Sequence, residues 1–391
     1  MATYHLKLKT LSPVFIGGKQ GNDLNRWKFF KYANNIYVID ELKLATALKE
    51  TNKIEEFCNF VNKNSQDGLQ QFLYINNWFG KEKSGLAKYF FNSDNANFPS
   101  SSVKTCIKDA FLIPYIPGSS IKGFVRTAIL YDFLDNIKNS NNDKFVKLVS
   151  GSFQGATNKK ADDKIIADTI SALAKGSGEN EEQSYWDILK TIKISDAYAE
   201  DKNISNIIKG CNAKVFESHY IPIALEGIKE GVELAFNIQI DNFIIKQFKD
   251  RLNRIRENIG NEVIRDYLDK IDEKFKLANL LGICKKFASK IIDEEKTYAS
   301  SRGYTKIKTF YNNIENNPNP IRIGYGSGLL STTIYLLMNP EQIETVRADF
   351  FRWHTETNRF PKTRRYIVDD RETPYLPFGW GSIEEVRNER Q

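Results

Sequence analysis

Residues that could build a metal centre are scarce in this chain of 391 residues. The four cysteines are far apart and no two of them form a CxxC pair; they stand at Cys58, Cys106, Cys211 and Cys284. This dispersal argues against a structural zinc site and indicates a reducing compartment. We therefore expect a cytoplasmic protein without a bound metal.

Long apolar runs are also missing. No stretch approaches the roughly 18 uninterrupted apolar residues that mark a transmembrane helix. The N-terminus, MATYHLKLKT, lacks the basic-then-apolar order of a secretory signal. The sequence thus predicts no membrane partner. Hydrophobic residues at 41% and charged residues at 27% are typical of a globular protein, long enough for two domains or one heavily inserted domain.

The sequence gives little support for a catalytic site. The three histidines, His5, His219 and His354, have no sequence neighbour that would orient a general base. Asp23 follows a glycine-rich loop that contains Lys19, where a carboxylate could hold Mg²⁺ or assist phosphodiester cleavage, although an ordinary turn aspartate is the simpler interpretation. We expect no enzymatic activity, with ribonuclease activity as the alternative.

Two glycine-rich segments fail as cofactor motifs. In PGSSIKG, Pro117–Gly123, the lysine precedes the glycine, which is the reverse of the Walker A order. In GYGSGLL, Leu329 stands where a dinucleotide fingerprint needs its third glycine. We therefore expect no nucleotide cofactor. The second segment is either a tight strand-to-helix turn or a contact to the phosphate backbone of a nucleic acid.

The charge balance favours a polyanionic partner. Lys and Arg outnumber Asp and Glu by 56 to 49, for a net charge of +7. Aromatic residues make up 13% and are interleaved with basic residues in RWKFFKY. Single-stranded RNA is bound by this combination, because bases stack on aromatic rings while cations follow the phosphates.

The first fifty residues predict a strand, a hairpin and a helix. Residues 4–10 alternate between apolar and polar, which predicts a strand with one buried face. Residues 27–40 predict a hairpin that turns at Asn34–Asn35. Asp40 is the expected N-cap of a helix over residues 41–50.

Strands and helices interleave along the chain, which predicts an α+β fold. The expected core comprises residues 1–240 with 305–391, and residues 241–304 read as mainly helical. Two polar segments, 92–105 and 136–184, cannot bury a core and are predicted to be flexible insertions.

The segment YIPGSSIKGFVRTAIL predicts a helix with two functional faces. One face is apolar and consists of Ile121, Phe124, Val125, Ala128 and Ile129. Ser119 or Ser120 is the expected N-cap, at a helix end whose free N–H groups favour a phosphate. Lys122 and Arg126 lie together on another face. The alternative is a capped amphipathic helix whose basic residues face water.

Four segments, in this order, resemble the RAMP superfamily of CRISPR proteins: LSPVFIGG, PYIPGSSIKGFVRTAIL, IKISDA and RIGYGSGLLSTT. The resemblance implies an RRM-like, ferredoxin-type core with long insertions and a helical region. The chain is most similar to the subunit of type III-A (Csm) effector complexes that caps the 3′ end of the crRNA. The wide spacing before PGSSIKG, the helical region and the ending PKTRRY…LPFGWGSIEEV favour that subunit.

The resemblance further implies a groove for the crRNA backbone. Its expected residues are Gly17, Gly18, Lys19, Arg26, Gly118, Ser119, Ser120, Lys122, Arg126, Tyr325, Gly326 and Ser327. Such contacts grip phosphate without reading sequence. The implied partners are the crRNA, the backbone subunit and other Csm subunits, and nucleases that trim the 3′ end. Two alternatives stay open: a RAMP ribonuclease that uses Asp23 or a histidine such as His5, and a scaffold without RNA affinity of its own.

Overall fold

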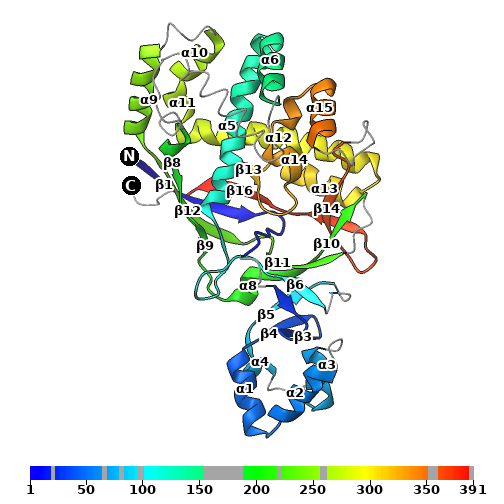
Figure 1. The fold of residues 1–391 in the computed structure, drawn as a ribbon. Helices are drawn as coiled ribbons and strands as arrows, with labels where there is room; N and C mark the ends of the chain where they lie inside the picture. The colour runs from blue at the N-terminus through cyan, green and yellow to red at the C-terminus, as the bar shows by residue number, and fades with distance from the viewer. Residues whose placement is uncertain are drawn as a thin grey trace.

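The computed structural model describes residues 1–18, 23–63, 68–78, 83–95, 98, 101–153, 188–217, 222–255, 262–350 and 360–386. Within these ranges, no helix is both long enough and apolar enough to cross a membrane. Helices and sheets are mixed along the chain, as an α+β fold requires (Figure 1).

The first sheet is built around the N-terminal strand, β1 (Ala2–Thr10), which pairs antiparallel with a strand on each side. Its order is β13 (Pro320–Arg322), β16 (Trp380–Glu385), β1, β12 (Glu233–Ile240), β9 (Ala197–Ala199) and β7 (Tyr115–Ile116), with β8 (Ile192–Ile194) also paired to β12. The alternation predicted for β1 is confirmed, because Leu6 and Leu8 are buried while His5 and Lys9 are exposed.

The second sheet is longer and runs toward the lower end of the molecule in Figure 1. Its order is β2 (Leu24–Asn25), β6 (Ser102–Lys104), β11 (Ile223–Ile228), β10 (Ile208–Phe216), β5 (Ala87–Ser93), β4 (Asn35–Ile39) and β3 (Phe29–Tyr32). Beside β10 lies β14 (Arg364–Val368), which pairs in turn with β15 (Pro374–Pro377).

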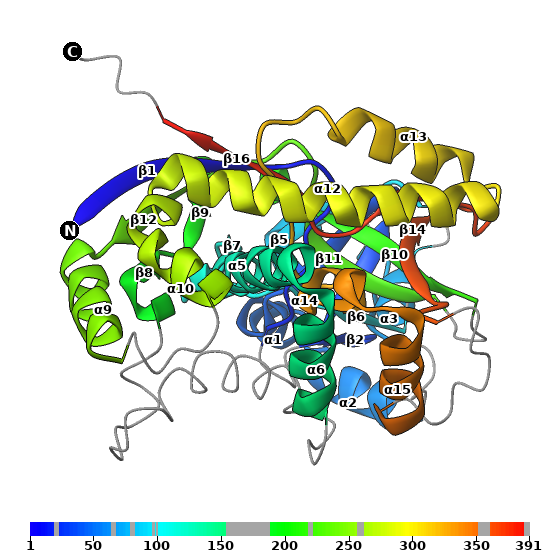
Figure 2. The same ribbon diagram turned by 90° about the horizontal axis from the view of Figure 1, so that it is seen from above.

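Two long helices, α5 (Gly118–Ser140) and α12 (Leu277–Ser301), pack on each other over the first sheet (Figure 2). Around them lie α6 (Asn142–Phe153), α9 (Asn242–Ile255), α10 (Glu262–Asp269), α11 (Ile271–Lys274), α13 (Thr305–Ile314), α14 (Gly328–Thr332) and α15 (Pro340–Phe350), with 3₁₀ turns η3 (Ile188–Thr191) and η5 (Tyr335–Leu337). The short helix α8 (Ile204–Ile207) lies instead against β5 and β10 of the second sheet. The region expected to be helical therefore contributes α9 to α12.

A second hydrophobic core lies apart from the main one. It is formed by Phe30, Ile39, Leu44, Leu48, Leu69, Phe72 and Leu73. The helices around it are α1 (Glu41–Glu50), α2 (Ile54–Lys63), α3 (Leu69–Ile75) and α4 (Lys83–Leu86), at the lower end of Figure 1. The sequence predicts one core over residues 1–240 with 305–391, because the spacing of apolar residues does not say which elements they pack against.

The hairpin and helix predicted near the N-terminus are present, with one shift. Asp40 caps α1, since its carboxylate accepts from the N–H groups of Leu42 and Lys43 at 3.1 and 3.3 Å. The hairpin turns one residue earlier than expected, at Ala33 and the residue after it, and Ala33 takes a positive φ of 51°. That conformation was expected of asparagine rather than alanine.

The two predicted insertions are more ordered than expected. Within 92–105, strand β6 pairs with β2 and β11, and Phe98 and Val103 are buried. Residues 136–153 belong to α5 and α6, which bury Ile137 and Phe145. In both segments a few apolar residues among polar ones suffice to dock the chain. Residues 154–187 lie outside the described residues.

Candidate nucleic-acid interface

The N-terminus of α5 is capped from a distant segment. The helix begins after Pro117, which makes no side-chain cap, so the N-cap expected at Ser119 or Ser120 is wrong. Instead the N–H of Gly118 donates to Oδ1 of Asp196 at 2.8 Å. A carboxylate of the protein thus satisfies a helix N–H group that was expected to meet a phosphate.

Gly118 is also required by packing. A Cβ atom at this position would lie 2.2 Å from the carbonyl oxygen of Ile194 and 2.7 Å from that of Ser195. The glycine therefore admits the protein's own backbone. Gly123, one turn further, is exposed and a Cβ there would meet nothing within 4 Å. The predicted apolar face of α5 is confirmed, since all five of its residues are buried.

Lys122 and Arg126 lie on the partly exposed side of the same helix. Both side chains are half-buried and stand one turn apart on α5. Apart from Lys138 near its C-terminus, they are the cationic residues of α5.

Two glycine loops that are far apart in sequence contact each other. The first contains Gly17 and Gly18, and the second is Gly324–Gly328. The N–H of Tyr325 donates to the carbonyl of Phe15 at 2.8 Å. Gly324 has a φ of +74°, and a Cβ there would lie 2.5 Å from the same carbonyl oxygen. In the first loop, Gly17 pairs with Cys106, and the N–H of Gly18 donates to the carbonyl of Thr105 at 3.3 Å. The contact with the Gly324–Gly328 loop is therefore made at Phe15, two residues before Gly17.

Tyr325 is held between two aromatic rings. Its ring makes edge contacts with Phe15 at 5.9 Å and with Phe378 at 5.3 Å between centroids. The guanidinium of Arg365 lies 5.3 Å from its centroid. Burial raises the pKa of Tyr325, so the phenol stays neutral. Arg365 was missed in the sequence, although the run PKTRRY could have indicated it.

Strand β11, which pairs at Ile228 with Val14 just before the first glycine loop, carries a buried carboxylate. Glu226 forms an ion pair with Lys108, and it accepts from the hydroxyl of Tyr89 at 3.0 Å and from the thiol of Cys106 at 3.2 Å. Burial raises the pKa of Cys106, and the nearby carboxylate adds to the effect. The thiol therefore stays protonated and inert.

Of three further predicted site residues, the structure describes two. Ser327 lies in the second loop, where its hydroxyl donates to the carbonyl of Gly324 at 2.7 Å, and α14, which follows this loop, contacts α5. Arg26 instead lies next to the second hydrophobic core, because its carbonyl accepts from Leu69 and its side chain packs against Gly68. Lys19 lies outside the described residues.

A pocket of about 280 Å³ opens beside the second glycine loop. We call it the loop pocket; it is lined by Glu295, Gly326–Leu330, Thr332 and Phe360–Arg365. Three of its side chains are cationic: Lys362, Arg364 and Arg365.

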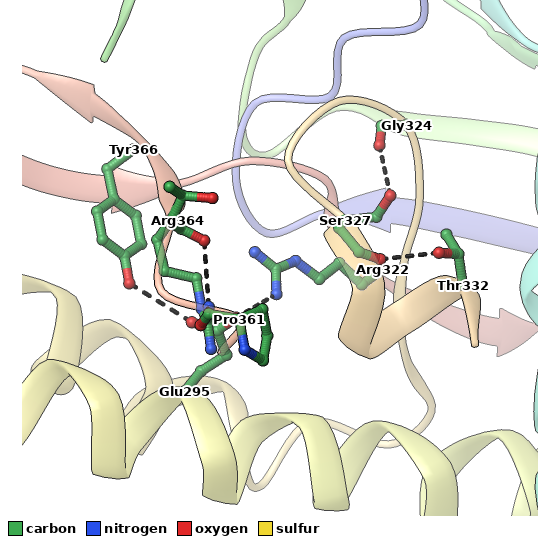
Figure 3. Close-up of polar contacts among 10 residues, drawn as sticks. Glu295, Arg322, Gly324, Ser327, Thr332, Pro361, Arg364 and Tyr366 are labelled. Carbon is green, nitrogen blue, oxygen red and sulfur yellow. Dashed lines mark hydrogen bonds and ion pairs between the residues drawn. The ribbon is translucent and has the colours of Figure 1, made fainter. Parts of the chain in front are cut away.

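Beneath the loop pocket lies a buried ionic network (Figure 3). Oε1 of Glu295 on α12 accepts from Arg322 on β13 at 2.9 Å and from Arg364 on β14 at 3.0 Å. The hydroxyl of Tyr366 donates to its other oxygen at 3.4 Å. Burial raises the pKa of Glu295, but the two guanidinium groups outweigh it and hold the pKa below its ordinary value. Two arginines against one carboxylate leave the network positively charged.

Asp23 and His5, the residues of the two ribonuclease alternatives, each have one described polar partner. Asp23 forms an ion pair with Lys104 at 2.7 Å, and both side chains are about half exposed. Nδ1 of His5 lies 2.7 Å from Oδ1 of Asn237 on an exposed face of the first sheet. Among the described residues, no cluster of three or more His, Cys, Asp or Glu side chains could hold a metal ion. His219 and His354 lie outside these residues.

Comparison with known families identifies the fold. A family model described as the RAMP superfamily matches residues 7–331. The chain belongs to the RAMP superfamily. The α+β class and the ferredoxin-like RAMP core expected from the sequence are confirmed.

Two curated RAMP relatives are named Csm5. The protein from Methanocaldococcus jannaschii is 24% identical over 362 residues, which cover 86% of this chain and 74% of the relative. The protein from Streptococcus thermophilus is 24% identical over 278 residues, which cover 68% of this chain and 70% of the relative.

Two solved structures share the fold over almost the whole chain. One is a chain in a cryo-EM structure of a Csm–crRNA–target RNA ternary complex of a type III-A CRISPR-Cas system, with a TM-score of 0.69, 22% identity, and coverage of 98% of this chain and 100% of that one. The other is crystalline Csm5 of T. onnurineus, with a TM-score of 0.68, 21% identity, and coverage of 96% and 99%.

Proposed function

We propose that this chain is a non-enzymatic, RNA-binding subunit of a type III-A Csm effector complex. It holds the 3′ portion of the crRNA, caps one end of the backbone filament, and supports maturation of the crRNA 3′ end and antiviral interference. Its partners are the crRNA, the backbone subunit and other Csm subunits, and nucleases that trim the exposed 3′ end. The similarity to Csm5 proteins and to a chain of a Csm–crRNA complex supports this assignment.

The observation that carries the proposal is the contact between the two glycine loops. The N–H of Tyr325 donates to the carbonyl of Phe15, two residues before Gly17, so the two loops lie close together although they are far apart in sequence. Glycine-rich backbone lets a phosphodiester chain approach closely, and it does so without reading bases. A subunit that must accept any guide sequence needs a grip of this kind.

The proposed contacts follow the geometry. Gly17 and Gly18 of the first loop, Gly326 and Ser327 of the second, and the side chains of α5 at Lys122 and Arg126 would meet RNA phosphates. The N–H of Gly118 is left out of this set, because Asp196 accepts its hydrogen bond.

The enzyme alternative is less well supported. Asp23 faces Lys104 at 2.7 Å, an arrangement that neutralises the carboxylate and competes with a bound cation. A histidine-based mechanism would need a partner that orients the ring toward the scissile phosphate, and the partner of His5 is a neutral amide on the next strand.

The salt dependence of RNA binding separates an RNA-binding subunit from a pure scaffold. Binding of single-stranded RNA to the full-length chain should weaken steeply with salt, because each neutralised phosphate releases counterions. In Lys122→Ala/Arg126→Ala the slope of log K against log salt should fall by about 1.4, at about 0.7 for each lost phosphate contact.

The matched control removes the same charge from an exposed face of another helix. Lys285→Ala/Lys290→Ala on α12 should leave the slope unchanged. Salt-independent binding by the wild-type chain, or equal slopes in both double variants, would reject the proposed contacts.

A further inference from the structure

The loop pocket has the size and lining of a site for one small ligand. Its volume of about 280 Å³ lies just under the roughly 300–1,000 Å³ of sites for drug-sized molecules. One part of its lining is apolar and consists of Leu329, Leu330, Phe360 and Pro361. Another is cationic, from Lys362 and Arg365. Such a division suits a ligand that carries both a flat apolar ring and an anion.

The charge of the loop pocket is not cancelled by its own carboxylate. Glu295 is engaged by Arg322 and Arg364 beneath the pocket. Within the described part of the chain, neither Lys362 nor Arg365 forms an ion pair with a carboxylate. The positive charge of these two lining residues is therefore available to an anion.

The wall of the pocket over residues 360–363 is fixed by hydrogen bonds from the protein interior. Tyr335 donates to the carbonyl of Phe360 at 2.6 Å, and Tyr298 donates to that of Lys362 at 2.9 Å. Arg364 donates to the two remaining carbonyls, at 2.8 and 3.1 Å. These bonds preorganise the wall and occupy four carbonyl oxygens that would otherwise repel an anion.

The loop pocket also adjoins the proposed RNA path. Gly326 and Ser327 belong to both, and Arg365 stacks near Tyr325, whose N–H joins the two glycine loops. A ligand in the pocket would therefore be continuous with an RNA strand that lies on the loops.

We propose that the loop pocket holds one unstacked nucleotide of the bound RNA, with its base against Phe360 and Pro361 and its phosphate on Lys362 and Arg365. This inference rests on the RNA-binding function proposed above. It predicts that one position in the 3′ portion of the guide matters more than its neighbours, although the identity of its base does not, because stacking tolerates every base.

An abasic scan in the reconstituted effector complex tests the pocket. Guides that each lack one base in the 3′ portion are loaded, and the rate of 3′ trimming by an added exonuclease is measured. In the wild-type complex one position should raise the rate about tenfold, as expected for the loss of one stacked base, and the others much less. In Lys362→Ala/Arg365→Ala this position dependence should disappear. In Lys285→Ala/Lys290→Ala it should persist.

Each other outcome overturns a definite part of the account. Equal effects at all positions in the wild-type complex, or a position dependence that survives in Lys362→Ala/Arg365→Ala, overturn the pocket alone. No protection beyond that of a complex lacking this subunit overturns the proposed function and the pocket together. Saturable binding of free AMP or UMP to the full-length chain, lost in the double variant and without any position effect in the guide, would assign the pocket to a soluble nucleotide and overturn the RNA source.

Discussion

Oδ1 of Asp196 accepts the hydrogen bond of the Gly118 N–H at 2.8 Å, across 78 residues of sequence. The two residues come from IKISDA and PGSSIKG, segments that both carry the resemblance to the RAMP superfamily. Their contact joins the turn after β8 to the start of α5. One of these segments thus caps the helix that begins in the other.

Removal of this cap should lower stability without strengthening RNA binding. Asp196→Ala should reduce the free energy of unfolding by about 1 kcal/mol, while Asp196→Asn should retain most of it because the amide oxygen can still accept. Urea unfolding of the full-length chain measures both. If the helix N-terminus were instead the phosphate site, Asp196→Ala would bind single-stranded RNA more tightly than the wild type, since a competing negative charge would be gone.

The two glycines of α5 should respond to alanine in opposite ways. In Gly118→Ala the new methyl group would lie 2.2 Å from a carbonyl oxygen, so the free energy of unfolding should fall by about 3 kcal/mol or more. In Gly123→Ala the methyl group meets open space, and the change should raise it by about 0.5–1 kcal/mol. Thermal unfolding of both variants provides the comparison. Equal effects would mean that the backbone contact at Gly118 is not as tight as described.

The buried carboxylate beneath the loop pocket should dominate acid sensitivity in its region. Glu295→Gln leaves Arg322 and Arg364 without a counter-charge, so the free energy of unfolding should fall by about 3–5 kcal/mol at neutral pH. Because the folded pKa of Glu295 is depressed, its contribution is fully present above the unfolded pKa near about 4.3 and is lost as the pH falls through the folded value.

Denaturant unfolding over a pH series checks this sign. The wild-type chain should lose more stability than Glu295→Gln between neutral pH and acid conditions below about pH 4.3. Parallel losses in the two proteins would show that the network does not depress the pKa of Glu295.

Asp23 should be dispensable for RNA cleavage. In the assembled complex, Asp23→Ala should cut target RNA at the wild-type rate in Mg²⁺, because the carboxylate is committed to Lys104. The exposed ion pair should contribute less than about 1 kcal/mol to stability. A loss of cleavage upon this change, with the complex intact, would favour the ribonuclease alternative.

Local features of the fold could be read from the sequence because they depend on spacing. The alternation that buries Leu6 and Leu8, the apolar stripe of α5 and the cap at Asp40 each involve residues within a few positions of one another. Long-range features could not be read. The separate core around Phe72 and the cap from Asp196 depend on which distant segments meet, and no local pattern encodes that.

The candidate site shows the same limit. Residue type alone marks the glycines of both loops in the sequence, but only the folded chain shows that the loops meet through Phe15 and Tyr325. Arg365 and Lys362 lie in a visible basic run, but only the fold places them beside the second loop. Residue propensity favours Ser119 or Ser120 as the cap, but the carboxylate of Asp196 takes that role because it lies beside the buried Gly118.

The central claim is tested most directly by the length of the crRNA that copurifies with the complex. Complexes with the wild-type subunit, Lys122→Ala/Arg126→Ala and the control Lys285→Ala/Lys290→Ala are purified, and the 3′ ends of their crRNAs are mapped. The account predicts that the first double variant assembles but carries crRNA with unprotected or wrongly matured 3′ ends, while the control matches the wild type. Unchanged crRNA length and occupancy in Lys122→Ala/Arg126→Ala would contradict it.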